Sequence, residues 1–397
     1  MKLILPLSLL SLLAFAPRAG AAENMSVTVA HELDAARPAE TITVPWSEIA
    51  KRLPNVLPSH IVVKDAKGAV IPDQLLNSKP EEHQDNYESI IFQHDFAAGE
   101  RTATFTLEKS EAPVPPFPTK VFARYVPERF DDFAWENDRV AHRIYGPGLG
   151  TPVAGKSQMF SSGVDIWCKR VRYPIIDRWY LMGHYHEDTG EGLDMYDVGK
   201  SRGCGGTGVW DGKKLFVSQN WKSWKVLANG PVRVVFELTY DPWDAGNGVN
   251  VSETKRFTLD AGHNLDEVES TFSWPQNKPT PLVIGIGIAK HTKGLVSAEA
   301  TQNEKGGWFS FWEKFQKDGQ LGTGVVLPAG TLSGFAEDDS NHLVLTKAKS
   351  GESVRYYLGG GWDGSGDFLD KASWEKYLED FAARLKSPVK VSFSEAK

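Results

Sequence analysis

Residues 184–186 read His-Tyr-His and lie in the most polar part of the chain, which covers residues 139–146 and 165–206. Imidazole and phenol groups can remove and return a proton near neutral pH. Segments that carry such side chains between strands are also where proteins usually mount their binding groups. His184, Tyr185 and His186 are therefore predicted to take part in acid–base catalysis.

The same two histidines allow two other interpretations. If they lie on a strand, their side chains point to one side, and Glu187, Asp188 or Asp194 can complete a site for a divalent metal. Alternatively, either histidine simply forms hydrogen bonds within a loop. We favour the acid–base interpretation, and a divalent metal is the one cofactor that the residues suggest.

Arginines and aromatic residues near the histidines are candidates for substrate binding. Arg143 and Tyr145 fall on one face of a predicted strand, and an arginine can hold a carboxylate through two parallel hydrogen bonds. An arginine that pairs with a residue of a neighbouring strand is an equally good interpretation. Tryptophan rings suit the C–H faces of sugars, although tryptophan also fills cores. The predicted substrate-binding residues are Arg139, Arg143, Tyr145, Arg202 and Trp210.

Two familiar catalytic patterns are rejected. Residues 203–208 match G-x-G-x-x-G, but a β pattern with a turn follows them instead of a helix that opens on phosphate. No G-x-S-x-G elbow for a serine nucleophile occurs. The acidic residues between 187 and 197 can include a glycosidase pair, whose carboxyl groups must lie ~5–9.5 Å apart. Acidic loop residues are more commonly just solvated.

The elements that must position these residues are mostly strands. In residues 232–240 apolar and polar side chains alternate, as in a half-buried strand, and residues 251–259 continue the alternation. Residues 374–385 instead repeat apolar side chains at the period of an amphipathic helix, and Asp370 or Ser373 can cap its start. The sequence therefore predicts an all-β fold, a large antiparallel sandwich with few helices, one of them near the C-terminus.

The chain divides into three predicted segments. Residues 1–22 have a positive start, an apolar stretch and a small-residue cleavage site, which are typical of a signal peptide. Residues 111–118 hold four prolines and favour an extended linker. We predict an N-terminal β-rich lobe over 23–110 and a main β-sandwich over 119–397. We expect a periplasmic or secreted protein.

Composition narrows the function classes. The 397 residues include 44 Lys+Arg and 51 Asp+Glu, a formal net charge of −7, so no basic surplus favours nucleic-acid binding. After the signal segment no run approaches the ~20 apolar residues that span a bilayer, so no membrane partner is expected. In an oxidising compartment Cys168 and Cys204 form one disulfide or remain two buried thiols.

Three segments carry a resemblance to a known family: ENDRVAHRIYGP (136–147), MYDVGKSRGCGG (195–206) and YLGGGWDGSGDF (357–368). Over most of residues 26–392 the chain resembles a bacterial secreted family catalogued as a domain of unknown function and found beside polysaccharide-degrading enzymes. One characterised branch of it is similar to an ulvan oligosaccharide dehydratase. The family is grouped with the galactose mutarotase-like supersandwiches, so the resemblance implies that fold.

The resemblance also implies β-elimination across C4–C5 of a uronic acid at an oligosaccharide end, by a dehydratase or a lyase. Such a reaction needs a cation for the carboxylate, a base for the C5 proton and an acid for the leaving oxygen. From chemistry and clustering we expect Arg143 or Arg202 as the cation. The expected base and acid are His184 or His186 and Tyr185 or Tyr196.

The predicted partner is an acidic oligosaccharide or polysaccharide, and two rival functions are kept. A glycoside hydrolase on acidic glycans would release reducing sugar without a double bond. A non-catalytic carbohydrate-binding protein would bind its ligand and leave it unchanged.

Overall fold

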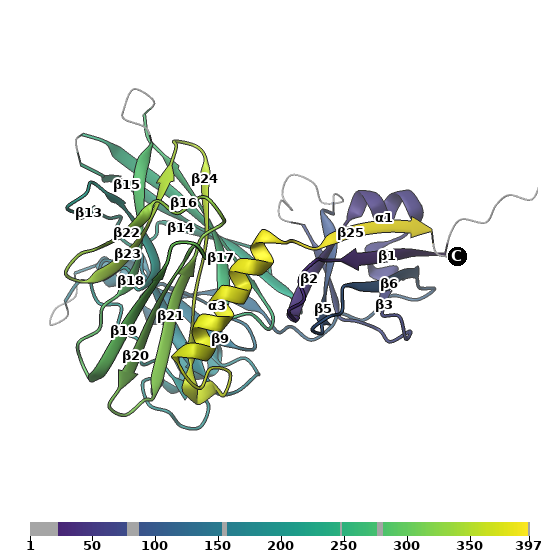
Figure 1. Cartoon of the computed structure of the whole chain (residues 1–397), viewed down its shortest axis with the longest axis horizontal. Helices are drawn as coiled ribbons and strands as arrows, with labels where there is room; N and C mark the ends of the chain where they lie inside the picture. The colour runs from purple at the N-terminus through teal and green to yellow at the C-terminus, as the bar shows by residue number, and fades with distance from the viewer. Residues whose placement is uncertain (1–22, 78–86, 153–156, 247, 276–280, 396–397) are drawn as a thin grey trace, which may run out of the picture.

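The computed structural model describes residues 23–77, 87–152, 157–246, 248–275 and 281–395. Two lobes lie side by side along the long axis of the molecule, and helix α3 (Lys371–Lys386) runs along the larger one (Figure 1). Within the described residues, no helix is long and apolar enough to cross a membrane.

The small lobe is a pair of antiparallel sheets around its own core. One sheet has the order β25-β1-β6-β3 and the other β2-β5-β4. Side chains alternate in burial along β1, and Val27, Phe92 and Phe105 belong to the core between the sheets. Its elements are β1 (Asn24–Ala30), β2 (Arg37–Pro45), α1 (Trp46–Arg52), η1 (Pro58–His60), β3 (Ile61–Lys64), β4 (Asp73–Leu76), β5 (Ser89–Phe96), β6 (Thr102–Lys109) and β25 (Lys390–Glu395).

The last strand of the chain belongs to the small lobe. β25 pairs antiparallel with β1, with Val391 opposite Val29. The small lobe is therefore built from both ends of the described chain, whereas a division at the proline-rich segment assigns these C-terminal residues to the main lobe.

The main lobe contains three sheets. The first, which we call the site sheet, has the order β11-β10-β9-β8-β7. Its strands are β7 (Phe122–Val126), β8 (Asp132–Glu136), β9 (Val140–Ile144), β10 (Val164–Lys169) and β11 (Gly192–Leu193). The segments around it include η2 (Pro127–Arg129), η3 (Pro147–Gly150) and α2 (Ile176–Met182).

The other two sheets complete the sandwich. The five-stranded sheet β13-β12-β18-β23-β22 comprises β12 (Cys204–Trp210), β13 (Leu215–Phe216), β18 (Leu282–Ala289), β22 (Gly334–Glu337) and β23 (Asn341–Ala348). The eight-stranded sheet β14-β15-β16-β17-β24-β21-β20-β19 comprises β14 (Ser223–Ala228), β15 (Arg233–Asp244), β16 (Asn250–Asp260), β17 (Leu265–Ser273), β19 (Leu295–Asn303), β20 (Trp308–Phe315), β21 (Gln320–Val326) and β24 (Ser353–Trp362). η4 (Asp363–Ser365) follows β24. One core joins all three sheets, with Trp135, Phe236 and Ile286 as members.

The predicted sandwich and its C-terminal helix are confirmed. Asp370 caps α3 by accepting from the backbone N–H of Ser373, and the Ser373 side chain donates back to the Asp370 carbonyl. Trp374 and Leu378 are fully buried on the face of α3 that packs on β20 and β21. Each such side chain contributes roughly 1.5–3 kcal/mol through burial.

The two cysteines are free thiols. Cys168 and Cys204 are both buried and form no disulfide. Of the two sequence expectations, the one with separate buried thiols holds. Burial raises the pKa of each thiol, so both stay protonated at neutral pH.

Candidate active site

The site sheet positions the first group of polar side chains. Arg143 on β9 lies opposite Asp165 on β10 and Ala134 on β8. Residues opposite each other in a sheet share a face, so all three lie on the face that α2 covers. The hydrophobic contacts that fix α2 there include Trp167 of β10 and Trp179 of the helix.

Arg143 is surrounded by carboxylates of its own chain. Its Nη2 donates to Asp165 and lies 3.3 Å from Asp194 Oδ2, and its Nε lies 3.9 Å from Asp132 Oδ2. All four side chains are buried. Burial raises the pKa of Asp194, and the neighbouring Asp165 carboxylate raises it further. Sequence reasoning missed this cluster because its carboxylates come from separate strands and loops.

Tyr185 lies against the same arginine. Its hydroxyl oxygen accepts from Arg129 Nε and from Arg143 Nη1, both at 3.3 Å. Its ring stacks on Trp167 with 4.9 Å between the ring centroids. Tyr185 is therefore held in place on both its polar and its apolar side, and Arg129 is a residue of the site that no sequence pattern revealed.

His186 is oriented by a backbone carbonyl. Its Nδ1 lies 3.0 Å from the carbonyl oxygen of Asp194 and 3.4 Å from Oδ2 of the same residue. The carbonyl oxygen can only accept, so Nδ1 carries the proton. The neutral ring then has its lone pair on Nε2. The side chain is 65% exposed and lines a cavity of about 730 Å³, so this lone pair is open to a ligand. This is the arrangement that a general base requires.

His291 lines the same cavity and is held as a cation. Its Nδ1 lies 2.8 Å from Glu313 Oε2, and its Nε2 lies 3.1 Å from the Asp197 carbonyl oxygen. Both partners are acceptors, so both ring nitrogens donate. Burial lowers the pKa of His291, but the Glu313 carboxylate outweighs burial and the pKa is raised. Sequence reasoning missed His291 because it lies far from the polar stretches.

Two tyrosines complete the walls of the cavity. Tyr145 and Tyr196 both line it. Among the described residues neither hydroxyl has a hydrogen-bond partner, and only that of Tyr196 is fully buried. The Tyr196 ring packs edge to face against the His291 ring, with 4.5 Å between the ring centroids. Burial raises the pKa of both phenols, so each keeps its proton at neutral pH.

The cavity, which we call the active cavity, is strongly cationic. Its walls carry six lysines and arginines against three aspartates. Lys290 pairs with Glu337 at 2.9 Å. Lys200, Lys293 and Lys317 have no carboxylate partner within the described part of the chain. The cationic residues are Arg129, Arg143, Lys200, Lys290, Lys293 and Lys317.

The remaining predicted site residues lie outside this cavity. His184 is exposed and does not line it. Arg139 pairs with Asp367 at 2.7 Å. Arg202 is buried and donates to Ser162 Oγ at 3.2 Å, and burial lowers its pKa to about 10. Trp210 ends β12, where it pairs with Leu215.

The metal interpretation requires His184 and His186 on one strand, and the structure places them elsewhere. His184 and His186 lie in the turn after α2, not on a strand, because Gly183 adopts a left-handed conformation with φ of 71° and ends the helix. The described residues contain no group of three or more His, Cys, Asp and Glu side chains arranged to hold a metal ion.

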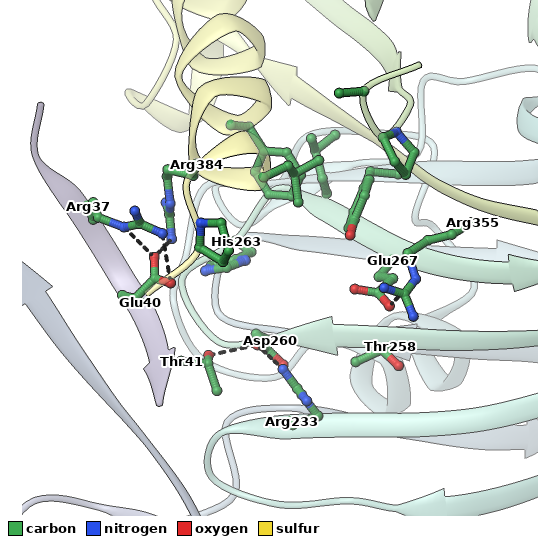
Figure 2. Close-up of a pocket in the computed structure, with 17 residues that line it drawn as sticks. Arg37, Glu40, Thr41, Arg233, Thr258, Asp260, His263, Glu267, Arg355 and Arg384 are labelled. Atoms are coloured by element: carbon green, nitrogen blue, oxygen red, sulfur yellow. Dashed lines mark hydrogen bonds and ion pairs between the residues drawn. The ribbon is translucent and has the colours of Figure 1, made fainter. Parts of the chain in front are cut away.

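A second cavity, of about 380 Å³, lies between the two lobes (Figure 2). Glu40 of β2 is 2.7 Å from Arg384 of α3 and 3.0 Å from Arg37. Thr41 donates to Asp260 at 2.7 Å, and Arg233 holds the same carboxylate through two hydrogen bonds. These charges are paired with each other and link the lobes.

Residues 29–391 match the family described as domain of unknown function (DUF4861). The chain belongs to this family. It is 33% identical over 383 residues to Uncharacterized protein P7 of Formosa agariphila, and the match covers 93% of each chain.

Solved structures share the fold. One is an alpha-mannosidase from Enterococcus faecalis V583, with a TM-score of 0.51 and 11% identity. The match covers 94% of this chain and 46% of the mannosidase chain. Another is a protein in glycosyl hydrolase family 38 from Enterococcus faecalis, with a TM-score of 0.50, 10% identity and 47% of its length covered. The chain thus spans about half the length of these structures.

Proposed function

We propose that this protein acts on an acidic oligosaccharide by β-elimination at a uronate unit, as a dehydratase or a lyase. The observation that carries the proposal is the open Nε2 of His186 in a cavity with three unpaired lysines. The fold, shared with an alpha-mannosidase, supports a carbohydrate substrate. The resemblance to an oligosaccharide dehydratase and the signal-like residues 1–22 support a secreted enzyme of polysaccharide breakdown.

The cations of the active cavity supply the first requirement. A uronate carboxylate gains charge when the neighbouring C5 loses its proton, and fixed cations stabilise that charge. The protonated His291 and the unpaired Lys200 and Lys293 meet this need. Arg143 is already engaged by Asp165 and Asp194, so we assign it a positioning role: it fixes the Asp194 segment whose carbonyl orients His186.

His186 and Tyr145 then divide the proton transfers. Nε2 of His186 takes the C5 proton, and the electron pair of that C–H bond forms the C4=C5 double bond. The C4–O bond breaks as the Tyr145 hydroxyl gives its proton to the leaving oxygen. The raised pKa of Tyr145 keeps it protonated before this step. Return of a proton from His186 to Tyr145 through water restores both groups.

The buried carboxylates beside Arg143 are not arranged as a glycosidase pair. A glycosidase needs two carboxyl groups on opposite sides of the scissile bond. Asp165 and Asp194 instead both approach Nη2 of Arg143 and are buried. No substrate bond fits between two groups that share one nitrogen atom.

The experiment is incubation of the purified protein with uronate-terminated oligosaccharides while ultraviolet absorbance and reducing ends are followed. The proposal predicts the absorbance of a conjugated enoate in the wild type and in His184→Ala, and its loss in His186→Ala. Reducing ends without absorbance would establish hydrolysis instead. Binding without any product would establish a carbohydrate-binding protein.

A further inference from the structure

A smaller cavity of about 250 Å³ adjoins the active cavity. Lys317 and Asp318, in the turn between β20 and β21, line both cavities. The Asp318 carbonyl accepts from Trp362 Nε1 at 2.7 Å, which fixes this turn to the end of β24. A ligand that fills the active cavity and continues past the turn therefore enters the adjoining cavity.

The adjoining cavity has firmly placed walls. The Arg170 guanidinium lies over the Trp362 ring at 4.5 Å, and its Nη2 is 2.6 Å from Asp188 Oδ2. The other Asp188 oxygen accepts from the backbone N–H groups of Gly190 and Gly192. The loop that begins with His186 is thus tied to β24 on the far side of the adjoining cavity. Such fixed polar walls suit a ligand unit held in one orientation.

The two cavities differ in charge. Cations outnumber carboxylates two to one around the active cavity. The adjoining cavity is lined by two cations, Arg170 and the unpaired Lys317, and by the three carboxylates of Asp188, Asp318 and Asp363. Arg170 is neutralised by Asp188. The Asp363 carboxylate accepts from the backbone N–H and the side chain of Gln320.

Asp318 is the carboxylate left for a ligand. Within the described residues its side chain has no hydrogen-bond partner or ion pair. A carboxylate can only accept hydrogen bonds, so it suits a hydroxyl group and repels an anion.

We propose that the adjoining cavity binds an uncharged, hydroxyl-bearing sugar linked to the uronate, and that Asp318 excludes a second anionic unit there. The inference rests on the proposed function and specifies its substrate as an oligosaccharide that joins an acidic unit to a neutral one. The active cavity holds the acidic unit, and Asp318 accepts a hydroxyl of its neighbour.

The test is calorimetric binding to His186→Ala protein, with three disaccharides whose uronate is linked to a neutral sugar, a sulfated sugar or a second uronate. The neutral neighbour should bind at least about 10-fold more tightly than either anionic one, the effect of one hydrogen bond to a charged group. Adding Asp318→Asn should shrink this preference to within about 3-fold. The same change at the exposed Asp241 of β15 should leave it intact.

The outcomes separate this inference from the proposed function. Equal binding of the three disaccharides, or a preference that Asp318→Asn leaves unchanged, would overturn the inference even if the wild type forms the double bond. If the wild type converts none of the disaccharides but the preference and its dependence on Asp318 are seen, the proposed function fails and the neutral-sugar site stands.

Discussion

The buried ion pair beneath α2 gives a prediction with a definite magnitude. Lys169 Nζ lies 2.6 Å from Glu136 Oε2, and both side chains are fully buried. Glu136 also accepts from the backbone N–H groups of Ile175 and Ile176, where α2 begins. Lys169→Met leaves a buried carboxylate without its cation, which costs about 3–5 kcal/mol of unfolding free energy. Because α2 leads into the turn of His186, catalysis should also fall.

The pH dependence of this loss has a definite sign. Burial raises the pKa of Glu136, and Lys169 opposes that rise, so the substitution moves the folded-state pKa further above the unfolded value. A carboxyl of this kind destabilises the fold as pH rises through its pKa, so the loss should be greater at pH 8 than at pH 5.

Urea unfolding of wild type and Lys169→Met at the two pH values measures the effect. Glu136→Gln combined with Lys169→Met should restore part of the lost stability at pH 8, because no charge is then buried. Lys376→Met on α3, where the lysine is 68% exposed, should change it by less than about 0.5 kcal/mol. A loss below about 1 kcal/mol at pH 8, or an equal loss at both pH values, would show that an unpaired Glu136 charge is not its cause.

Three further predictions follow from single residues. His186→Ala should lower kcat by about 10²–10⁴-fold with little change in unfolding free energy. His184→Ala, at a residue outside the cavity, should change kcat less than about 3-fold. Equal losses of kcat would show that His186 is not the base. Burial raises the pKa of Asp73 to about 7, so the folded state loses stability as pH rises towards that value and the carboxyl ionises. Asp73→Asn should therefore raise the free energy of unfolding by about 1–3 kcal/mol at pH 8 and leave it unchanged at pH 4. Equal gains at both pH values would oppose this. Cys168 and Cys204 should be unreactive to a thiol reagent in the native protein and both titrate in denaturant; fewer than two thiols would reveal a disulfide.

Local patterns predicted local structure well. Alternation over 232–240 reappears in β15, where Val234, Phe236 and Leu238 are buried. The apolar spacing before Pro388 reappears in α3. These patterns suffice to predict a strand or a helix because each element buries one face, and the spacing of apolar residues along the chain shows its period.

Contacts between distant segments were beyond such patterns. β25 pairs with β1 from the other end of the chain, and no pattern in its six residues predicts which strand it pairs with. The carboxylates around Arg143 are gathered by strand register, which a one-residue shift would undo. Likewise, Arg202 lies in the polar stretch, but its side chain is buried and donates to Ser162 in the interior.

In the proposed reaction His186 removes a carbon-bound proton from an acidic sugar. The most direct measurement is the fate of the uronate C5 hydrogen in D₂O, followed by NMR with wild type, His186→Ala and Tyr145→Phe. C5–H should be lost as the double bond forms in the wild type, and His186→Ala should leave it intact. Tyr145→Phe, which keeps the base but lacks the acid, should exchange C5–H for deuterium faster than it forms product. Retention of C5–H in wild-type product, or its undiminished loss with His186→Ala, would show that His186 is not the base.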